Sequence, residues 1–312
     1  VGRKQMRCVY KTIKSLPKNS YWMNHQSLEG SQMGTEPNSA GMRLLGKVAV
    51  ITGGARGIGA ASAKVFAQNG ASVVIADILD DLGTALADSI GGKYTHCDVA
   101  KEADVESAVN LAISWKGKLD IMFNNAGIGS SEGSVKGVDM GIVRRVFSIN
   151  VEGVLLGIKY GARAMVKTGS RGSIILTASS AALMGGLGSH SYTASKGAII
   201  GLMQSAACEL GVDGIRVNCI SPHGVPSEML VSGYREALGK EDVSADDVRR
   251  TVEEGGSLLR GRAATVEDVA NAALYLASDE AGFITAHNLV VDGGFTAAKT
   301  DMAFIYRMQT DA

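Results

Sequence analysis

The sequence predicts an α/β fold, with a single doubly wound parallel sheet and helices on both faces. From Gly46 onward, short β-branched runs alternate with longer amphipathic runs, which is the pattern of repeated strand–helix–strand units. Glycine is frequent, at 40 residues, and aromatic residues make up only 5% of the chain. This composition suits the close backbone packing of a sheet that is covered on both sides.

Each element follows from its length and pattern. Seven short β-branched segments bounded by turn residues are expected as strands: 47–51, 72–76, 93–97, 119–123, 172–177, 214–220 and 288–291. Longer amphipathic segments between them are expected as helices: 58–69, 80–90, 102–116, 138–168, 192–210 and 266–278. Ligands of such sheets bind at the carboxyl ends of the strands, so site residues are expected in the loops that follow them.

Two segments interrupt this alternation. Residues 128–137 are expected to form a flexible loop. Residues 224–265 begin with apolar side chains and end with charged ones, which predicts either a lid over an apolar ligand or a peripheral helix pair.

The chain is expected to divide into a basic and disordered N-terminal extension at 1–40, one nucleotide-binding domain at 41–298, and a tail at 299–312. The stretch from Val1 to Leu28 holds six basic residues and no acidic one. It is interpreted as a transit peptide, as sequence upstream of a natural start at Met33, or as an ordinary tail. We expect a cytoplasmic protein, or a plastid or mitochondrial one if the extension is a transit peptide.

Charge and cysteine content exclude several classes of function. The 31 basic and 31 acidic residues balance, so no nucleic-acid partner is expected. The four cysteines and five histidines show no metal-like spacing, and we expect no metal site. No apolar stretch approaches the roughly 20 residues that span a bilayer, so no membrane partner is expected.

A glycine-rich turn follows the first strand. Gly53, Gly57 and Gly59 lie where that strand is expected to lead into a helix, and such a turn lets backbone N–H groups approach a phosphate at the helix N-terminus. Asp77 follows the second strand, close to the offset of about 20 residues expected of an acid that binds an adenosine ribose. Together these features predict a Rossmann-type dinucleotide site.

A tyrosine and a lysine stand four residues apart in "SHSYTASKGA". On a helix, Tyr192 and Lys196 would lie one turn apart, about 6 Å along the axis, so both side chains can address one point. Considered alone, the pair is more simply explained by a packed tyrosine and a solvated lysine.

The order of the motifs resembles the short-chain dehydrogenase/reductase family. The spacing TGxxxGxG is followed by CDVA, NNAG, INVEG, TASSAAL, YTASK and NCISPHGVPSEM, so the resemblance covers residues 44–297. Within the family, "GKVAVITGG", "HSYTASK", "IRVNCISP" and "NLVVDGGF" are most similar to plant members of specialised metabolism.

The resemblance implies which residues bind a nicotinamide dinucleotide. It implies pyrophosphate contacts, adenosine contacts and nicotinamide contacts from, in chain order, Gly53, Arg56, Gly57, Ile58, Gly59, Asp77, Asp98, Val99, Asn125, Ala126, Gly127, Tyr192, Lys196, Pro222, Val225 and Ser227. An acid at position 77 would repel a 2′-phosphate and favours NAD over NADP. Arg56 argues for NADP, and its alternative interpretation is a solvated loop charge. Serine at 227 keeps the hydroxyl of the threonine that many members have.

The resemblance also implies a catalytic set of Asn150, Ser179, Tyr192 and Lys196. Tyr192 would act as the base, with its pKa lowered by Lys196 and the oxidised nicotinamide. Ser179 would hold the substrate oxygen, and Asn150 would keep a water in place for proton relay. His190 and His223 are interpreted as polar residues of the substrate mouth or as specificity contacts.

The sequence therefore predicts an oxidoreductase that transfers a hydride from a hydrophobic secondary alcohol, such as a terpenoid or lignan, to NAD. The apolar pocket is expected to comprise Leu183, Met184, Leu187, Met229 and Leu230. The alternatives are an NADP-dependent carbonyl reductase acting on a ketone and a nucleotide-sensing protein without catalysis. The resemblance implies a homotetramer or homodimer, with helices 138–168 and 192–210 at the interface.

Overall fold

The computed structural model describes residues 42–298, which form a seven-stranded, wholly parallel sheet in the order β3-β2-β1-β4-β5-β6-β7. The strands are β1 (Val48–Thr52), β2 (Ser72–Asp77), β3 (Lys93–His96), β4 (Ile121–Asn124), β5 (Ser173–Thr177), β6 (Arg216–Pro222) and β7 (Asn288–Val291). The predicted fold class is confirmed. The expectations for residues 1–40 and for the tail at 299–312, and with them the cellular compartment, lie outside the described residues.

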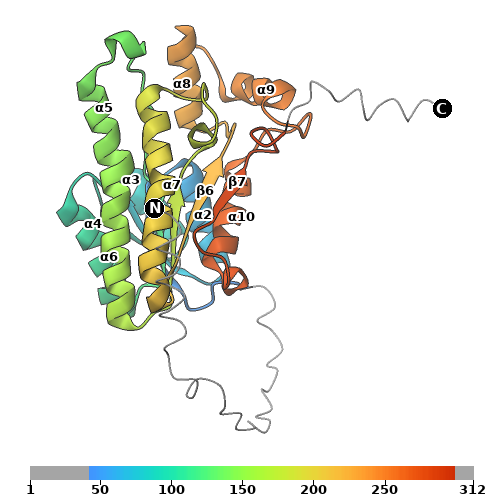
Figure 1. Ribbon diagram of the computed structural model, residues 1–312. Helices are drawn as coiled ribbons and strands as arrows, with labels where there is room; N and C mark the ends of the chain where they lie inside the picture. Colours follow the sequence, from blue (N-terminus) through green and yellow to red (C-terminus); the bar gives the residue numbers. More distant parts are fainter. Residues whose placement is uncertain (1–41, 299–312) are drawn as a thin grey trace, which may run out of the picture. The chain divides into compact units, whose positions relative to one another are not determined.

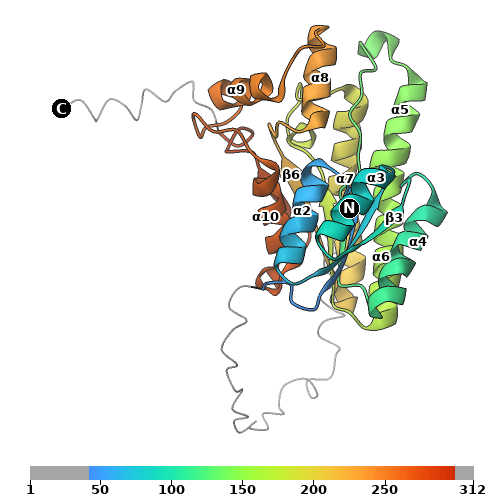
Figure 2. The ribbon, with the colours of Figure 1, turned by 180° about the vertical axis from the view of Figure 1, so that it is seen from behind.

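Helices cover both faces of the sheet (Figures 1 and 2). One face carries α4 (Glu102–Lys116), α6 (Gly153–Thr168) and α7 (His190–Leu210), and the other carries α2 (Gly57–Gln68), α3 (Asp80–Ser89) and α10 (Val266–Ala277). Alternate strand residues feed the two cores. In β1, Val50 packs against the first set of helices and Ile51 against the second. Both faces are thus buried, which explains why the strands are apolar throughout.

The predicted helix 138–168 is interrupted. It consists of α5 (Met140–Phe147), a π-helical turn η2 (Ser148–Glu152) and α6. Asn150 lies within η2 and is completely buried. A π turn displaces the helix by part of a turn, and such turns are frequent at functional sites. Sequence periodicity does not detect this turn, because the residues around it remain helical.

Residues 224–265 form a helix pair. Both α8 (Glu228–Leu238) and α9 (Ala245–Gly255) lie beyond one end of the sheet (Figure 1). A small core of their own joins them, built from Val231, Val243 and Val248, with Leu230 packed against it. The segment is therefore a distinct subassembly at the end of the sheet where β6 finishes.

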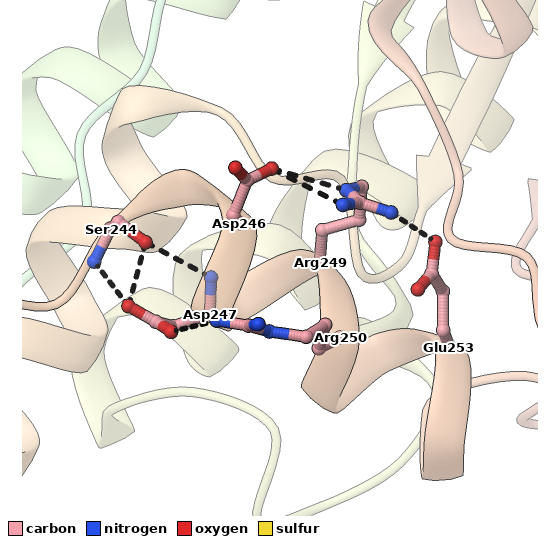
Figure 3. Close-up of polar contacts among 6 residues, drawn as sticks. All are labelled: Ser244, Asp246, Asp247, Arg249, Arg250 and Glu253. Carbon is pink, nitrogen blue, oxygen red and sulfur yellow. Dashed lines mark hydrogen bonds and ion pairs between the residues drawn. The ribbon is translucent and has the colours of Figure 1, made fainter.

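The charged part of this segment satisfies its own polar groups (Figure 3). Ser244 caps α9, and Asp247 accepts from the Ser244 backbone N–H at 2.9 Å in a reciprocal capping box. Arg249 pairs with Asp246 and with Glu253 one turn away on either side, and all three side chains belong to α9. This face of α9 is a solvated surface.

Candidate active site

The turn between β1 and α2 depends on glycine. Gly53 and Gly57 have φ of 62° and 56°, values that other residues rarely adopt. A methyl group on Gly59 would lie 2.0 Å from the Gly53 carbonyl oxygen, so the helix starts tightly against the turn. Arg56, the N-cap of α2, makes no side-chain capping bond. The N–H groups of Gly57, Ile58 and Gly59 are therefore suited to bind an anion.

Asp77 ends β2 beside this turn and is 7% exposed. Its Oδ2 accepts from the backbone N–H of Ala55 at 2.9 Å, and its Oδ1 accepts from the N–H of Leu79 at 3.1 Å. These bonds fix the carboxylate next to the glycine turn. Each oxygen keeps a lone pair with which it can accept from a ribose hydroxyl.

Arg56 has a partner that sequence reasoning missed. Its guanidinium pairs with Glu228, the first residue of α8. Both side chains are exposed, so the pair is weak in water. The pair nevertheless engages Arg56, the only basic residue between Gly53 and Gly59. The two partners are 172 residues apart in the sequence. No local pattern in the sequence signals such a pair.

The residues predicted to contact adenine follow β3. Val99 is 6% exposed and packs into the core, where a methyl group on Gly153 would lie 2.8 Å from its Cγ2 atom. Asp98 is bound within its own loop, because its Oδ1 accepts from the N–H of Ala100 at 3.1 Å and its N–H donates to Asp104. The Val99 side chain is therefore packed in the core, and Asp98 is the more accessible of the two residues.

The loop after β4 joins the cofactor turn to the catalytic residues. The Nδ2 of Asn125 donates to the carbonyl oxygens of Thr52 and Gly53 at 3.1 and 3.0 Å, so this side chain binds the protein itself. Ala126 lies against Gly53, where a methyl group on the glycine would be 2.8 Å from the Ala126 Cα. The nicotinamide contacts predicted for this loop are therefore expected from its backbone groups and from Gly127.

The side chain of Asn150 has a structural role that was not expected from the sequence. Its Oδ1 accepts from the N–H of Ile128 at 2.9 Å, and its Nδ2 donates to the Ile128 carbonyl oxygen at 3.0 Å and to Ser195 Oγ at 3.1 Å. Both amide protons are used within the protein. Its side chain therefore fastens the loop after β4 to α7, and the expected role of Asn150 in keeping a relay water in place stays a prediction.

The structure brings Ser179, Tyr192 and Lys196 together. Ser179 follows β5, is 8% exposed, and has its hydroxyl near enough to the Tyr192 phenol to lower the pKa of that phenol. Tyr192 lies in the first turn of α7, and the Lys196 Nζ is 5.6 Å from the centroid of its ring. The Lys196 Nζ also donates to the Thr177 carbonyl oxygen at 2.8 Å. The predicted i, i+4 geometry is therefore confirmed.

Burial controls the titration of this group of residues. It raises the pKa of the Tyr192 phenol above its usual value, and the Ser179 hydroxyl opposes that rise. Burial also lowers the pKa of Lys196 to about 8. In the chain's own residues desolvation is the largest influence on the tyrosine pKa, and the expected lowering of that pKa by Lys196 together with the oxidised nicotinamide stays a prediction.

The segment after β6 carries the remaining predicted contacts. Pro222 ends β6, and Val225 is 7% exposed and packs into the core beside α2 and α10. Ser227 is the N-cap of α8, yet its hydroxyl makes no capping bond. That hydroxyl remains suited to donate to or accept from a ligand amide.

The two histidines occupy different environments. His190 is exposed at the start of α7. His223 is held by Ser180, whose Oγ lies 2.8 Å from its Nδ1, and it stacks on Phe295 at a centroid distance of 4.2 Å. Burial lowers the pKa of His223, and Asp292 opposes this. Of the two histidines, only His223 is held by side-chain contacts, and it directly follows β6.

The side chains expected to form the apolar pocket are only partly covered. Leu183, Met184 and Met229 are 44%, 36% and 44% exposed. Met229 of α8 approaches Gly129, where a methyl group would lie 3.9 Å from the methionine Cγ. The helix pair and the loop after β4 therefore meet. Leu230 is half-buried and packs against the small core of the helix pair, and its place in the pocket stays a prediction.

Sequence reasoning also missed Glu132. It lies in the segment 128–137, which was expected to be flexible, and is 4% exposed. Its carboxylate accepts from the backbone N–H and the hydroxyl of Ser191 in α7. An available signal was the run of Ser189 and Ser191 before Tyr192, because serine hydroxyls at a helix start bind backbone and carboxylate groups. The segment is anchored to α7.

Among residues 42–298 no cluster of histidine, cysteine, aspartate and glutamate could hold a metal ion. Within the same range, no helix is long and apolar enough to cross a membrane.

Known proteins share this chain's sequence and fold. A family model described as Enoyl-(Acyl carrier protein) reductase matches residues 53–296. The "Short-chain dehydrogenase reductase ATA1" of Arabidopsis thaliana is 61% identical over 85% of this chain and 97% of its own. The "(+)-borneol dehydrogenase 2" of Salvia officinalis is 46% identical over 84% of this chain and 93% of its own. A short-chain type dehydrogenase/reductase of Mycobacterium marinum, of known structure, superimposes with a TM-score of 0.73 at 33% identity, over 82% of this chain and 98% of its own.

Proposed function

Because the chain belongs to the short-chain dehydrogenase/reductase family, with plant oxidoreductases among its relatives, we propose that it oxidises a hydrophobic secondary alcohol and uses NAD as the hydride acceptor. The observation that carries this proposal is the contact of Ser179, Tyr192 and Lys196 at the carboxyl end of β5. A hydroxyl, a phenol and an ammonium that meet in a buried corner can bind an alcohol oxygen and move its proton.

The residues of the glycine turn fit a nicotinamide dinucleotide. Backbone N–H groups at the start of α2 would bind the pyrophosphate, and the fixed carboxylate of Asp77 would accept from the ribose hydroxyls. A nicotinamide held there in its oxidised form would supply the acceptor for the hydride of the carbinol carbon. A buried carboxylate at position 77 would repel a 2′-phosphate, which supports NAD over NADP.

Each catalytic side chain has a separate task. The Ser179 hydroxyl hydrogen-bonds the substrate oxygen and orients it toward Tyr192. The phenol oxygen of Tyr192, when ionised, takes the hydroxyl proton of the alcohol; in the reverse reaction the neutral phenol returns that proton to the carbonyl oxygen. The Lys196 ammonium, whose Nζ donates to the Thr177 carbonyl oxygen and lies 5.6 Å from the centroid of the Tyr192 ring, supplies positive charge beside the phenol.

The tyrosine pKa sets the direction of the pH dependence. Because burial raises the pKa of Tyr192, its neutral form dominates at neutral pH. Alcohol oxidation needs the phenolate and is therefore expected to accelerate as pH rises. Carbonyl reduction needs the neutral phenol and is expected to slow over the same range.

The substrate class follows from the walls of the site. Leu183, Met184 and Met229 present apolar surface near the mouth, and α8 brings Met229 against the loop after β4. An apolar ring system would cover these side chains and release water from them. We therefore propose a terpenoid or lignan alcohol, which accords with the name of the borneol dehydrogenase relative.

The test is turnover with a panel of cyclic terpenoid and lignan alcohols, followed by the near-ultraviolet absorbance of reduced nicotinamide with NAD and with NADP. Tyr192→Phe is expected to abolish turnover while cofactor binding persists. Asp77→Ala is expected to weaken NAD more than NADP, and equal losses would contradict the role of the carboxylate. Cofactor binding without turnover on any alcohol or ketone would instead indicate a nucleotide-sensing protein.

An NADP-dependent carbonyl reductase is the second candidate, and Arg56 is the observation in its favour. The guanidinium stands in the glycine turn, where a 2′-phosphate would approach it. Its ion pair with Glu228 already engages that charge. Faster ketone reduction with NADPH than alcohol oxidation with NAD, across the same panel and at neutral pH, would establish this alternative.

We also propose a homotetramer or homodimer. Leu155 and Val166 are 50% and 54% exposed and lie on α6, part of the segment 138–168 that is expected at the interface. Light scattering of the purified protein tests this, and a monomer at micromolar concentration would contradict it.

A further inference from the structure

Glu132 is a buried carboxylate that the proposed reaction does not use. It lies in the loop between β4 and α5 and is 4% exposed. Its bonds run to the first turn of α7: Oε1 accepts from the backbone N–H of Ser191 at 2.6 Å, and Oε2 accepts from the Ser191 hydroxyl at 2.9 Å. A loop residue therefore satisfies backbone and side chain of the helix that carries Tyr192 and Lys196.

A second set of bonds joins the same two segments. The Ser130 hydroxyl lies 2.6 Å from the Ser189 hydroxyl and 2.9 Å from the Ser191 hydroxyl. Ser189 is the N-cap of α7, and its oxygen accepts from the N–H of Tyr192 at 3.4 Å. The turn that holds the reacting tyrosine is thus connected to the loop through Ser130 and Glu132 together. A carboxylate here also complements the partial positive charge of a helix N-terminus.

The other end of this loop is fixed to the cofactor side. Asn150 binds both backbone groups of Ile128, and its Nδ2 also donates to Ser195 of α7. Residues 128–132 therefore form a short strap between Gly127, beside Lys196, and the start of α7. Glu132 is the far anchor of this strap.

The anchor does not switch with pH in the working range. Burial would raise the pKa of Glu132, but the hydrogen bonds from Ser191 and Ser130 lower it to about 2. The side chain is therefore ionised at neutral pH and binds α7 with charge-assisted hydrogen bonds.

We propose that Glu132 is a positioning residue for Tyr192: by holding the N-terminal turn of α7, it keeps the phenol aligned with Ser179 and Lys196. This inference rests on the proposed dehydrogenase function for its kinetic part. A tyrosine displaced by a fraction of an ångström would still bind cofactor and substrate, so the loss would appear in kcat and leave KM largely unchanged.

Three variants of Glu132 separate the effect of side-chain length from that of side-chain charge. Glu132→Ala removes both acceptor oxygens and is expected to lower kcat by roughly tenfold to a hundredfold. Glu132→Gln keeps the reach and one acceptor oxygen for Ser191, so it is expected to retain most of kcat. Glu132→Asp keeps the charge on a side chain that is one methylene shorter and is expected to lose more kcat than the glutamine variant.

Asp268→Ala is the matched control. Like Glu132, Asp268 is a carboxylate that binds the start of a helix: it lies in the first turn of α10 and accepts from the backbone N–H of Thr265 in a capping box. The control is expected to lower the melting temperature and to leave kcat per folded molecule at the wild-type value. The pH profile of kcat is expected to shift in Glu132→Ala and to stay unchanged in the control.

Hydrogen exchange makes the test independent of turnover. The amides of residues 190–193 are expected to exchange faster in Glu132→Ala than in wild type, with no such change in Asp268→Ala. If wild type turns over no alcohol, the proposed function fails, and the exchange data still decide the role of Glu132. Wild-type kcat in both Glu132→Ala and Glu132→Asp, or unchanged exchange at 190–193, would overturn the proposal. If the alanine variant does not fold, equal kcat in the glutamine and aspartate variants would overturn it.

Discussion

Replacement of Lys196 by methionine tests the cost of the buried ammonium. Lys196 is 4% exposed, and burial lowers its pKa from 10.5 to about 8. The folded protein therefore releases this proton near pH 8, whereas the unfolded chain keeps it up to about pH 10.5. Between these values the unfolded chain binds more protons, so the free energy of unfolding rises with pH as far as this residue contributes.

The magnitude follows from the size of that pKa difference. Each pKa unit corresponds to about 1.4 kcal/mol, so Lys196 is expected to destabilise the folded protein below pH 8 by roughly 3 kcal/mol relative to its effect above pH 10.5. The hydrogen bond to the Thr177 carbonyl oxygen, at 2.8 Å, offsets part of this cost at neutral pH. Methionine has a similar length and no proton, so Lys196→Met removes the pH-dependent part.

The assay is urea unfolding of both proteins at a series of pH values from neutral to alkaline. Groups that do not interact with Lys196, such as Cys97 with its pKa raised to about 12, titrate in both proteins, and their effect cancels in the difference. Cys219 does not cancel, because Lys196 lowers the pKa of its thiol, and the comparison is therefore made below the pH at which Cys219 titrates. The stability of wild type minus that of Lys196→Met is expected to rise by roughly 3 kcal/mol across the range. A difference that stays constant would refute the argument. The variant is also expected to lose turnover.

Two further predictions concern packing and cofactor choice. Gly157→Ala would place a methyl group 1.6 Å from the Asn124 Oδ1 and is expected to destabilise the fold by about 1–3 kcal/mol in thermal unfolding. Gly197→Ala is the control and is expected to be tolerated, because no atom lies within 4 Å of the added methyl group. Equal stability of the two variants would contradict the close packing of α6 on β4. Glu228→Gln would free Arg56 from its ion pair and is expected to raise kcat/KM for NADP by up to about fivefold without raising kcat/KM for NAD. If kcat/KM changed equally for both cofactors, the ion pair would serve only to fasten α8.

The local motifs of the site were predictable from sequence. The glycine turn with Asp77 can be predicted because the motif consists of glycines and a strand-end acid at fixed separations along the chain. The pairing of Tyr192 with Lys196 is legible because four residues make one helical turn. Each depends on separations of one element or one strand–helix unit, over which chain geometry is nearly fixed.

The titration of the site was not predictable in this way. A sequence indicates that Lys196 is close to Tyr192, and this proximity alone suggests a lowered tyrosine pKa. The tertiary structure surrounds both side chains with protein, and desolvation then raises the pKa of the phenol and lowers that of the ammonium. Desolvation is a property of everything packed around a group, which no local pattern encodes.

The sequence by itself determined the fold class, the order of the strand-end loops and the candidate catalytic side chains, because periodicity and short motifs record local geometry. Only the tertiary structure decided which distant partners hold them. Asn150 bonds across 45 residues to Ser195, and Glu132 bonds across 59 residues to Ser191. Those bonds form only once packing of the sheet and helices has brought the segments together, and they fix where the tyrosine stands.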